Sequence, residues 1–188
     1  MKYNSNIEQL LANAFAGESQ ARNRYTIFAS IAKKEGYPII SDIFLATAEN
    51  EREHAKLFYK HISNGKHNVD TEYPFFIGTT IENLKSAIDG EHEEWEYIYK
   101  EGANKAKSEG YDDIYVLFSR VLEVEKYHEH RFTQLYEHLK NGTLFERNEE
   151  TQWECSKCGY ILINKSAPKK CPCCKHEQGY FKSFCGKQ

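Results

Sequence analysis

The chain has 188 residues, of which 28% are charged, with a formal net charge of −3 at pH 7 and a sequence pI of about 6.3. It contains no basic block and no apolar run approaching 18 residues, which argues against nucleic acid or a membrane as the partner. The first residues lack the pattern of a signal peptide, so we expect a cytoplasmic protein with one medium-sized domain and a small appendage.

Apolar side chains recur at helical spacing through the first 140 residues, which predicts four helices. The expected helices cover about residues 5–35, 38–64, 81–109 and 112–140. Ser5 and Glu8 fit a capping box at the first helix, Gly36 ends it, and Pro38 suits the first turn of the second. The segment 65–79 has no helical period and is long for a bundle loop. It is predicted to be a crossover along the bundle.

The second and fourth helices carry matching stripes that contain a Glu-x-x-His pair each. The stripes are Ile40, Phe44, Thr47, Glu51, His54 and Phe58, and Ile114, Phe118, Val121, Glu125, His128 and Phe132. Each member of the second stripe lies 74 positions after its counterpart. Residues three apart share a helix face, so each pair aims a carboxylate and an imidazole toward the core. A carboxylate there is costly unless something pairs with it, which suggests a metal.

Two lone glutamates complete the pattern. Glu18 lies on the stripe of the first helix and Glu91 on that of the third, and the dipeptide GE at 17–18 recurs at 90–91. A Glu from each of two helices plus Glu-x-x-His from the other two is the pattern of ferritin-like di-iron or di-manganese bundles. Glu94 takes the place of Ala21 in the repeat, and we interpret it as a seventh, redox-linked ligand that offsets charge on oxidation.

Oxygen-rich sites with one imidazole per metal suit iron or manganese better than zinc or copper(I). The competing interpretation is that these acids are surface residues on charge-rich helices, as Glu49, Glu53, Glu93 and Glu96 are expected to be. Six further histidines are expected not to be ligands: His61, His67, His92, His130, His138 and His176.

Tyr25 and Tyr99 each lie about two turns along the face of a lone glutamate. Such tyrosines are more often core aromatics than catalytic groups. Next to a di-iron site they could hydrogen-bond peroxide or a ligand carboxylate, so both roles stay open.

All six cysteines follow residue 154, and four of them form two C-x-x-C pairs, Cys155 with Cys158 and Cys171 with Cys174. This spacing predicts a tetrahedral four-thiolate site for iron or zinc. Cys173 and Cys185 have no place in a closed site and are expected to be free. We predict a bundle over 1–140, a polar linker over 141–152 and a small metal-dependent domain over 153–188.

These motifs together resemble the rubrerythrin family over the full length of the chain. The resemblance is carried by AFAGESQARNRY (14–25), ENEREHAK (49–56), AIDGEHEEWEYIY (87–99), VEKYHEHRF (124–132), WECSKCGY and CPCC. It implies a mainly α protein, in which a ferritin-like four-helix bundle with one long crossover precedes a rubredoxin-like domain.

The resemblance also implies an activity and a set of ligands. The protein is expected to be a non-haem peroxidase that reduces hydrogen peroxide to water in oxidative-stress defence. By resemblance, Glu51 and Glu125 bridge two irons, while Glu91 and His128 hold one of them. The other iron is held by Glu18.

That second iron is expected to take His54 when reduced and Glu94 when oxidised. Electrons would come through a third iron at the four cysteines, from a reduced-nicotinamide-dependent reductase or a separate rubredoxin. Zinc remains open at the cysteines, and manganese or zinc in the bundle. Helix four would carry the tail about 18 Å from the bundle site, so the family's head-to-tail or domain-swapped homodimer is adopted as a hypothesis.

One departure from the family concerns the second cysteine knuckle. Lys175 follows it, where rubredoxins usually have a small residue, often Gly. Such knuckles favour positive φ, which costs a residue other than Gly about 1 kcal/mol or more.

Two other functions compete with peroxidase. A ferritin-like protein that oxidises and sequesters iron would explain the bundle, although storage does not need the cysteine tail as an electron supply. A binding protein with a structural zinc at the cysteines and an inert bundle would explain the tail.

Overall fold

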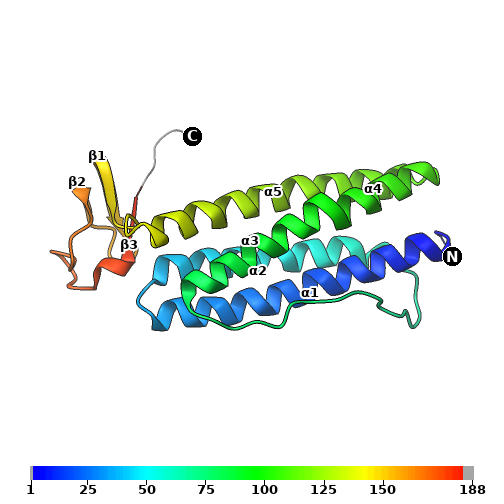
Figure 1. Ribbon diagram of the computed structural model, residues 1–188, viewed down its shortest axis with the longest axis horizontal. Helices are drawn as coiled ribbons and strands as arrows, with labels where there is room; N and C mark the ends of the chain where they lie inside the picture. Colours follow the sequence, from blue (N-terminus) through cyan, green and yellow to red (C-terminus); the bar gives the residue numbers. More distant parts are fainter. Residues whose placement is uncertain (1, 184–188) are drawn as a thin grey trace.

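The computed structural model describes residues 2–183, which form a long helical bundle with a small sheet at one end (Figure 1). The helices are α1 (Ser5–Lys34), α2 (Pro38–Tyr59), α3 (Thr80–Glu93), α4 (Tyr99–Ser108) and α5 (Asp112–Lys140). A short π-helix, η1 (Glu94–Ile98), joins α3 to α4, so these three segments form one continuous rod. The mainly α fold with a four-helix bundle is therefore confirmed.

The chain forms two antiparallel helix pairs. One consists of α1 and α2, and the other consists of the α3–η1–α4 rod and α5. The segment between α2 and α3 runs beside α1 along the bundle (Figure 1), which confirms the predicted crossover. Asn13 on α1 fastens it, because its amide donates to Asp70 O at 3.0 Å.

The core has two apolar clusters with a polar layer between them. One cluster, toward the N-terminal end of α1, includes Leu11, Phe58 and Phe118, and the other includes Phe28 and Phe44. Every residue of the two predicted stripes is buried. The Glu-x-x-His pairs lie between the Ile/Phe positions and the last Phe of each stripe, so they occupy the polar layer.

Two helix boundaries differ from the sequence-based expectation. Asn4, rather than Ser5, caps α1, and its Oδ1 accepts from the backbone N–H of Asn6 and Ile7. The predicted capping box is wrong because Glu8 is drawn away and accepts from Ser63 N–H at 3.0 Å. Helix α2 ends at Tyr59, about one turn early, since the chain must leave it to begin the crossover.

The third helix is interrupted, which the helical period alone did not predict. At η1 the backbone follows a π-turn, a feature that widens a helix locally and is frequent at functional sites. Glu94 is the first residue of this turn and is buried.

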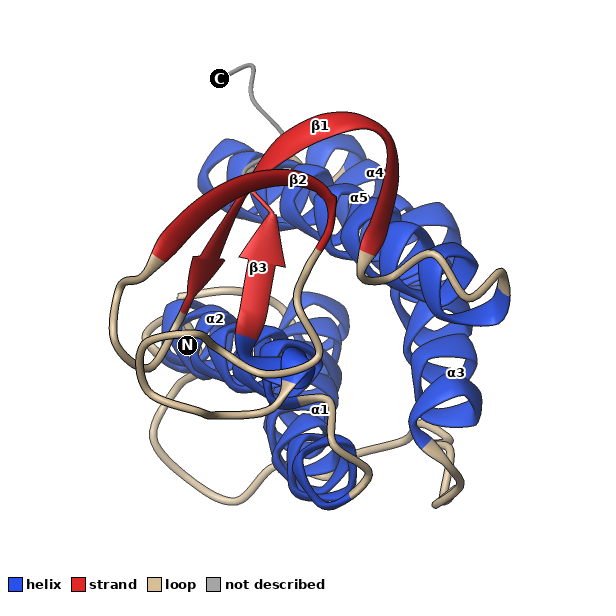
Figure 2. Cartoon of the chain, turned by 90° about the vertical axis from the view of Figure 1, so that its left-hand side faces the viewer, coloured by secondary structure: helices blue, strands red, loops and turns tan. Residues whose placement is uncertain are grey.

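The C-terminal sheet has the order β2-β1-β3, with β1 at Glu146–Cys155, β2 at Ile161–Ser166 and β3 at Phe181–Ser183 (Figure 2). Both pairings are antiparallel. Residues 146–152 were expected to be linker but form the first part of β1, where Thr151 pairs with Asn164. Cys185 lies outside the described residues.

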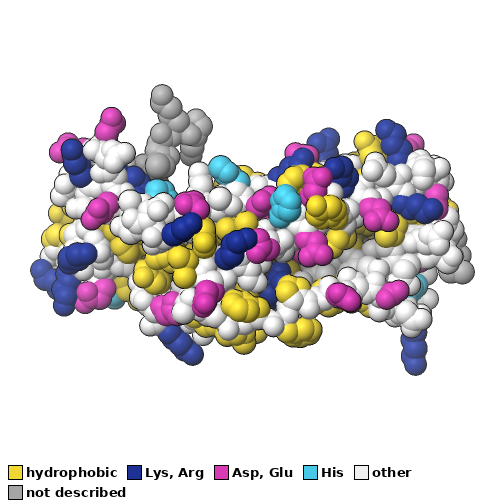
Figure 3. Space-filling model, in the orientation of Figure 1, with side chains coloured by type: hydrophobic (Ala, Val, Ile, Leu, Met, Phe, Trp, Pro, Cys, Tyr) yellow, Lys and Arg dark blue, Asp and Glu magenta, His cyan; other side chains and the backbone are white. Residues whose placement is uncertain are grey.

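The sheet domain rests on the turn between α1 and α2. Gly179 in the 3-10 helix η2 (Gln178–Tyr180) approaches Gly36, and a Cβ on Gly179 would stand 2.1 Å from the Gly36 carbonyl oxygen. The visible face mixes acidic and basic side chains with hydrophobic patches (Figure 3). Within residues 2–183, no helix has the length and apolar character needed to cross a membrane.

Candidate metal centres

The polar layer of the bundle brings four glutamates and two histidines together from four helices. They are Glu18 on α1, Glu51 and His54 on α2, Glu91 on α3, and Glu125 and His128 on α5. All six are buried, and the most exposed, His54, shows only 7% of its surface. Helical spacing explains the convergence, because each residue continues a stripe whose other members pack in the two apolar clusters.

These six residues form two sets that could each hold a metal ion. One set contains Glu18, Glu51, His54 and Glu125, and the other contains Glu51, Glu91, Glu125 and His128; within each set the ligand atoms lie within 4.8 Å of one another. Glu51 and Glu125 belong to both sets. Their two oxygens point to different histidines: Glu125 Oε1 lies 2.9 Å from His54 Nδ1, and Oε2 lies 2.7 Å from His128 Nδ1.

The ligand atoms are close together without being hydrogen-bonded. Both oxygens of Glu51 and Glu125, one oxygen of Glu18 and Glu91, and Nδ1 of both histidines are buried without a hydrogen-bond partner. The short distances between these nitrogen and oxygen atoms therefore do not represent hydrogen bonds, because the geometry is not that of a donor pointing at an acceptor. Buried polar groups in native proteins almost always have partners. Eight orphaned atoms aimed at two shared points fit a pair of metal ions.

Electrostatics of the layer lead to the same conclusion. Burial, followed by the neighbouring Glu51 carboxylate, raises the pKa of Glu91 to about 8. Burial also raises the pKa of Glu18 and Glu94 well above the usual range. Burial lowers the pKa of His128, but the adjacent carboxylates outweigh it and raise that pKa to about 12. Without cations, protons must neutralise this cluster, and divalent ions would replace them.

Two tyrosines hold the lone glutamates in place across the bundle. The Tyr25 hydroxyl donates to Glu91 Oε1 and the Tyr99 hydroxyl donates to Glu18 Oε1, both at 2.5 Å. Each bond thus links the two helix pairs: Tyr25 on α1 donates to Glu91 on α3, and Tyr99 on α4 donates to Glu18 on α1. The oxygen that accepts the bond is the one not facing the metal position, which is how outer partners orient metal ligands.

Glu94 does not join either set, although it is buried beside them. It lines a cavity together with Tyr99, the tyrosine whose hydroxyl bonds Glu18. In this structure His54, rather than Glu94, therefore completes the Glu18 set.

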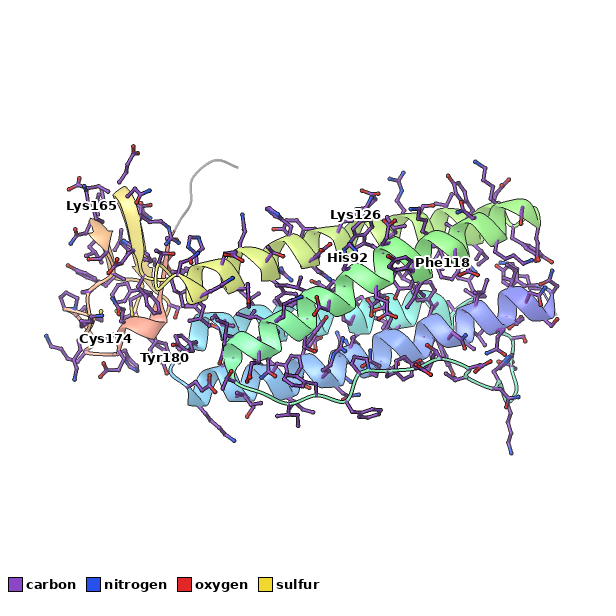
Figure 4. All side chains as sticks on the ribbon, viewed as in Figure 1. His92, Phe118, Lys126, Lys165, Cys174 and Tyr180 are labelled. Atoms are coloured by element: carbon purple, nitrogen blue, oxygen red, sulfur yellow. The ribbon has the colours of Figure 1, made fainter. Side chains whose placement is uncertain are left out.

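The remaining histidines lie apart from the layer. His92 contacts Glu129, with 3.2 Å between Nδ1 and Oε1, on the outer surface of the α3–α5 pair (Figure 4). His61 shares a hydrogen bond with the Tyr3 hydroxyl, and His138 shares one with the Thr143 hydroxyl. Within residues 2–183, the three groups that could hold a metal contain no histidine besides His54 and His128.

The second site lies in the sheet domain, where Cys155, Cys158, Cys171 and Cys174 converge. The Sγ atoms of Cys155 and Cys174 are 3.7 Å apart, as are those of Cys158 and Cys171. Thiolates around a tetrahedral ion with bonds near 2.3 Å lie about 3.8 Å apart, so the four sulfurs fit such an ion. Cys173 is exposed and belongs to no group.

Lys175 has a φ of +64°, the only positive value among the described residues other than glycine. The knuckle therefore has the conformation that the sequence predicted. Its backbone N–H donates to Cys171 O at 3.0 Å and its Nζ donates to Pro172 O at 2.8 Å, and these bonds offset part of the cost of the left-handed conformation.

The two sites lie far apart within one chain. Cys174 is at the end of the molecule beyond α5, whereas His92, the neighbour of Glu91, lies along the bundle (Figure 4). His128 is twelve residues before the end of α5, a rise of about 18 Å.

One buried residue beside the site escaped the sequence analysis. Arg24 is 7% exposed, and its Nε and Nη1 have no hydrogen-bond partner. The only sign of its burial in the sequence was its position three residues after Ala21, on the inner side of α1.

Comparison with known proteins agrees with this architecture. The family model described as Rubrerythrin matches residues 9–136, and that described as Rubrerythrin, rubredoxin-like domain, matches residues 153–182. A rubrerythrin of Porphyromonas gingivalis is 48% identical, over 94% of this chain and 89% of its own length. A rubrerythrin of Nitratidesulfovibrio vulgaris is 41% identical, over 94% of this chain and 93% of its own.

Solved structures show the same fold. Fully reduced, all-ferrous nigerythrin superimposes with a TM-score of 0.65 at 28% identity, covering 98% of this chain and 89% of its own. The bacterioferritin of Rhodobacter capsulatus gives a TM-score of 0.68 at 19% identity, covering 75% of this chain and 89% of its own, which shows the ferritin-like fold alone. The two family models together cover most of the chain, and the curated relatives match it over nearly its full length. The chain therefore belongs to the rubrerythrin family.

Proposed function

We propose that the protein is a non-haem di-iron peroxidase that reduces hydrogen peroxide to water. The observation that carries the proposal is the pair of ligand sets that share Glu51 and Glu125. Each set offers one imidazole and several carboxylate oxygens, a donor set that suits iron. Two irons held there would supply the two electrons that hydrogen peroxide needs, since H2O2 + 2 H⁺ + 2 e⁻ gives 2 H2O.

Each residue of the layer has a proposed role. Glu51 and Glu125 would be shared by both metals, Glu91 and His128 would hold one of them, and Glu18 would hold the other. His54, whose Nδ1 lies 3.6 Å from Glu18 Oε2, would join Glu18 in holding the reduced metal.

Glu94 would replace His54 when the metals are oxidised, because a fifth carboxylate would offset the added charge. Its place in a π-turn, where the helix ladder is already loosened, leaves its backbone room to adjust. Tyr25 and Tyr99 keep the carboxylates of Glu91 and Glu18 oriented. Each hydroxyl has one proton, so it could donate to a peroxide oxygen only in place of its carboxylate.

Electrons are proposed to enter through an iron at the four cysteines, from a reductase or a rubredoxin. Within one chain this site lies beyond the end of α5, far from the bundle layer. We therefore propose a head-to-tail or domain-swapped homodimer, in which the tail of one chain serves the bundle of its partner. A reducing compartment such as the cytoplasm keeps these thiols available for metal.

Ferritin-like iron storage is the second candidate, since the fold is shared with bacterioferritin. It leaves the four-cysteine site without a task, so peroxidase accounts for more of the molecule. A structural zinc at the cysteines would leave the orphaned atoms of the bundle unexplained.

The bridging roles predict different metal losses. Glu51→Ala should remove both bundle metals, because Glu51 belongs to both sets, whereas Glu91→Ala should remove about one. Metal analysis of the purified proteins measures this, with the exposed Glu53→Ala as control. Equal losses in the Glu51 and Glu91 variants would contradict a bridging role.

The cysteine assignment predicts a contrast between two exposed thiols. Cys158→Ser should abolish the ferric-thiolate absorption of the tail, because one of four ligands is lost. Cys173→Ser should leave that absorption unchanged. A visible spectrum decides, and bleaching by the Cys173 variant would show that the ligand set is wrong.

Peroxidase activity predicts fast recolouring of the reduced protein. The protein is reduced without oxygen and mixed with stoichiometric hydrogen peroxide in a stopped-flow spectrometer. Ferric-thiolate colour should return far faster than in a Glu51→Ala, Glu94→Ala double variant. A colourless protein would indicate zinc in the tail, and equally slow recolouring would favour iron storage.

The proposed dimer predicts complementation between two inactive variants. Cys171→Ser lacks the tail site and Glu51→Ala lacks the bundle site, so each alone should be inactive. Unfolding and refolding them together should restore activity in heterodimers, while mixing without subunit exchange should not. Absence of recovery in confirmed heterodimers would mean that electrons do not cross between subunits.

A further inference from the structure

A cavity of about 360 Å³ lies beside the metal layer, between α1, the crossover and the α3–η1–α4 rod. Its polar lining includes Arg24, Glu94 and Tyr99, and its apolar walls include Leu10, Ile98 and Phe118. Tyr99 and Glu94 connect it to the bundle site, because Tyr99 bonds the Glu18 carboxylate. A small molecule in the cavity would thus lie next to Glu94 and to the tyrosine that bonds Glu18.

Arg24 is the unusual member of this lining. It is 93% buried, yet Nε and Nη1 have no hydrogen-bond partner, and none of the ion pairs in residues 2–183 includes it. The guanidinium carbon lies 5.5 Å from the centroid of the Tyr25 ring. Burial of a charge without a partner is costly, so a role in binding would explain its presence.

The helix opposite leaves space for this guanidinium. A Cβ on Gly90 would stand 2.8 Å from Arg24 Nη2, so the arginine packs against bare backbone. Gly90 lies one turn before Glu94, and helical side chains lean toward the N-terminus. Arg24 and Glu94 therefore approach the same part of the cavity from opposite helices, without forming an ion pair.

The chemistry of the lining selects the kind of ligand. Four carboxylates line the cavity, from Glu72, Glu93, Glu94 and Glu101, against a single Arg24. The excess of carboxylates disfavours an anion as the ligand. It favours a neutral molecule whose oxygens accept from the guanidinium and whose O–H donates to a carboxylate. The volume far exceeds the roughly 30 Å³ of one water, and the apolar walls suit an alkyl group.

We propose that this cavity is a hydroperoxide-binding chamber in which Arg24 positions the peroxide oxygens, and that the substrate class extends to small alkyl hydroperoxides. The inference rests on the proposed peroxidase function. The reaction is ROOH + 2 H⁺ + 2 e⁻ giving ROH + H2O: the O–O bond breaks, both protons come from solvent, and a reduced rubredoxin-class donor supplies the electrons. Arg24 donates to the peroxide oxygens throughout and is not consumed.

The substrate range is tested on the holoenzyme with tert-butyl hydroperoxide beside hydrogen peroxide. Turnover is measured with a reduced rubredoxin as donor, and tert-butanol is quantified by gas chromatography. Stoichiometric tert-butanol is expected. A protein that reduces hydrogen peroxide but forms no tert-butanol overturns this inference, whereas reduction of neither substrate overturns the proposed function.

Arg24 is tested by Arg24→Met and Arg24→Lys, with the exposed Arg22→Met as matched control. Loss of the donor should raise KM for both peroxides about tenfold with kcat little changed, and Lys should restore part of it. The melting temperature of Arg24→Met should not fall, since an unpaired buried charge is removed. An unchanged KM, or a lowered melting temperature with no recovery in the Lys variant, would show a structural role instead.

Discussion

Burial of many ionisable groups in one core layer is the constraint on which the rest of the structure depends. Six ligand-type side chains, all at most 7% exposed, meet between two apolar clusters, with eight atoms unpartnered. Leaving such groups unpaired in a low-dielectric core costs several kcal/mol per charge. The aromatic packing of the long helices and the tyrosine hydrogen bonds keep these groups buried despite that cost. Because the groups carry charge, protons or cations in the layer are needed to neutralise them.

This constraint explains why the sequence was so informative about the layer. A glutamate at an apolar stripe position is conspicuous, and a repeat of 74 residues places the second pair where the first predicts it. Helix period, loop length and cysteine spacing are properties of local sequence, so the stripes, the crossover and the cysteine pairs were all predicted. The helix ends were predicted less well, because Asn4, Glu8 and Tyr59 are decided by competing local bonds and by the path of the crossover.

The residues that sequence reasoning missed depend on contacts between distant segments. The environment of Arg24 arises from Gly90, sixty-six positions away, and neither residue is unusual in its own helix. The first half of β1 has a polar sequence, and it belongs to the strand because Glu146 pairs with Ser166 and, after a bulge, Thr151 pairs with Asn164. Such pairings follow from the assembled fold, which periodicity alone does not contain.

The π-turn is a different case, because the sequence does carry its sign. Glu18 and Glu91 are 73 positions apart, whereas Tyr25 and Tyr99 are 74 apart. One additional residue must therefore lie between Glu91 and Tyr99, and the structure accommodates it in the π-turn at Glu94–Ile98. A π-turn absorbs one residue without breaking the helix, so Tyr99 still reaches Glu18 as Tyr25 reaches Glu91. The insertion thus preserves the equivalent hydrogen bonds of the two tyrosines. Glu94 breaks the symmetry, because its counterpart in the first half of the repeat is Ala21.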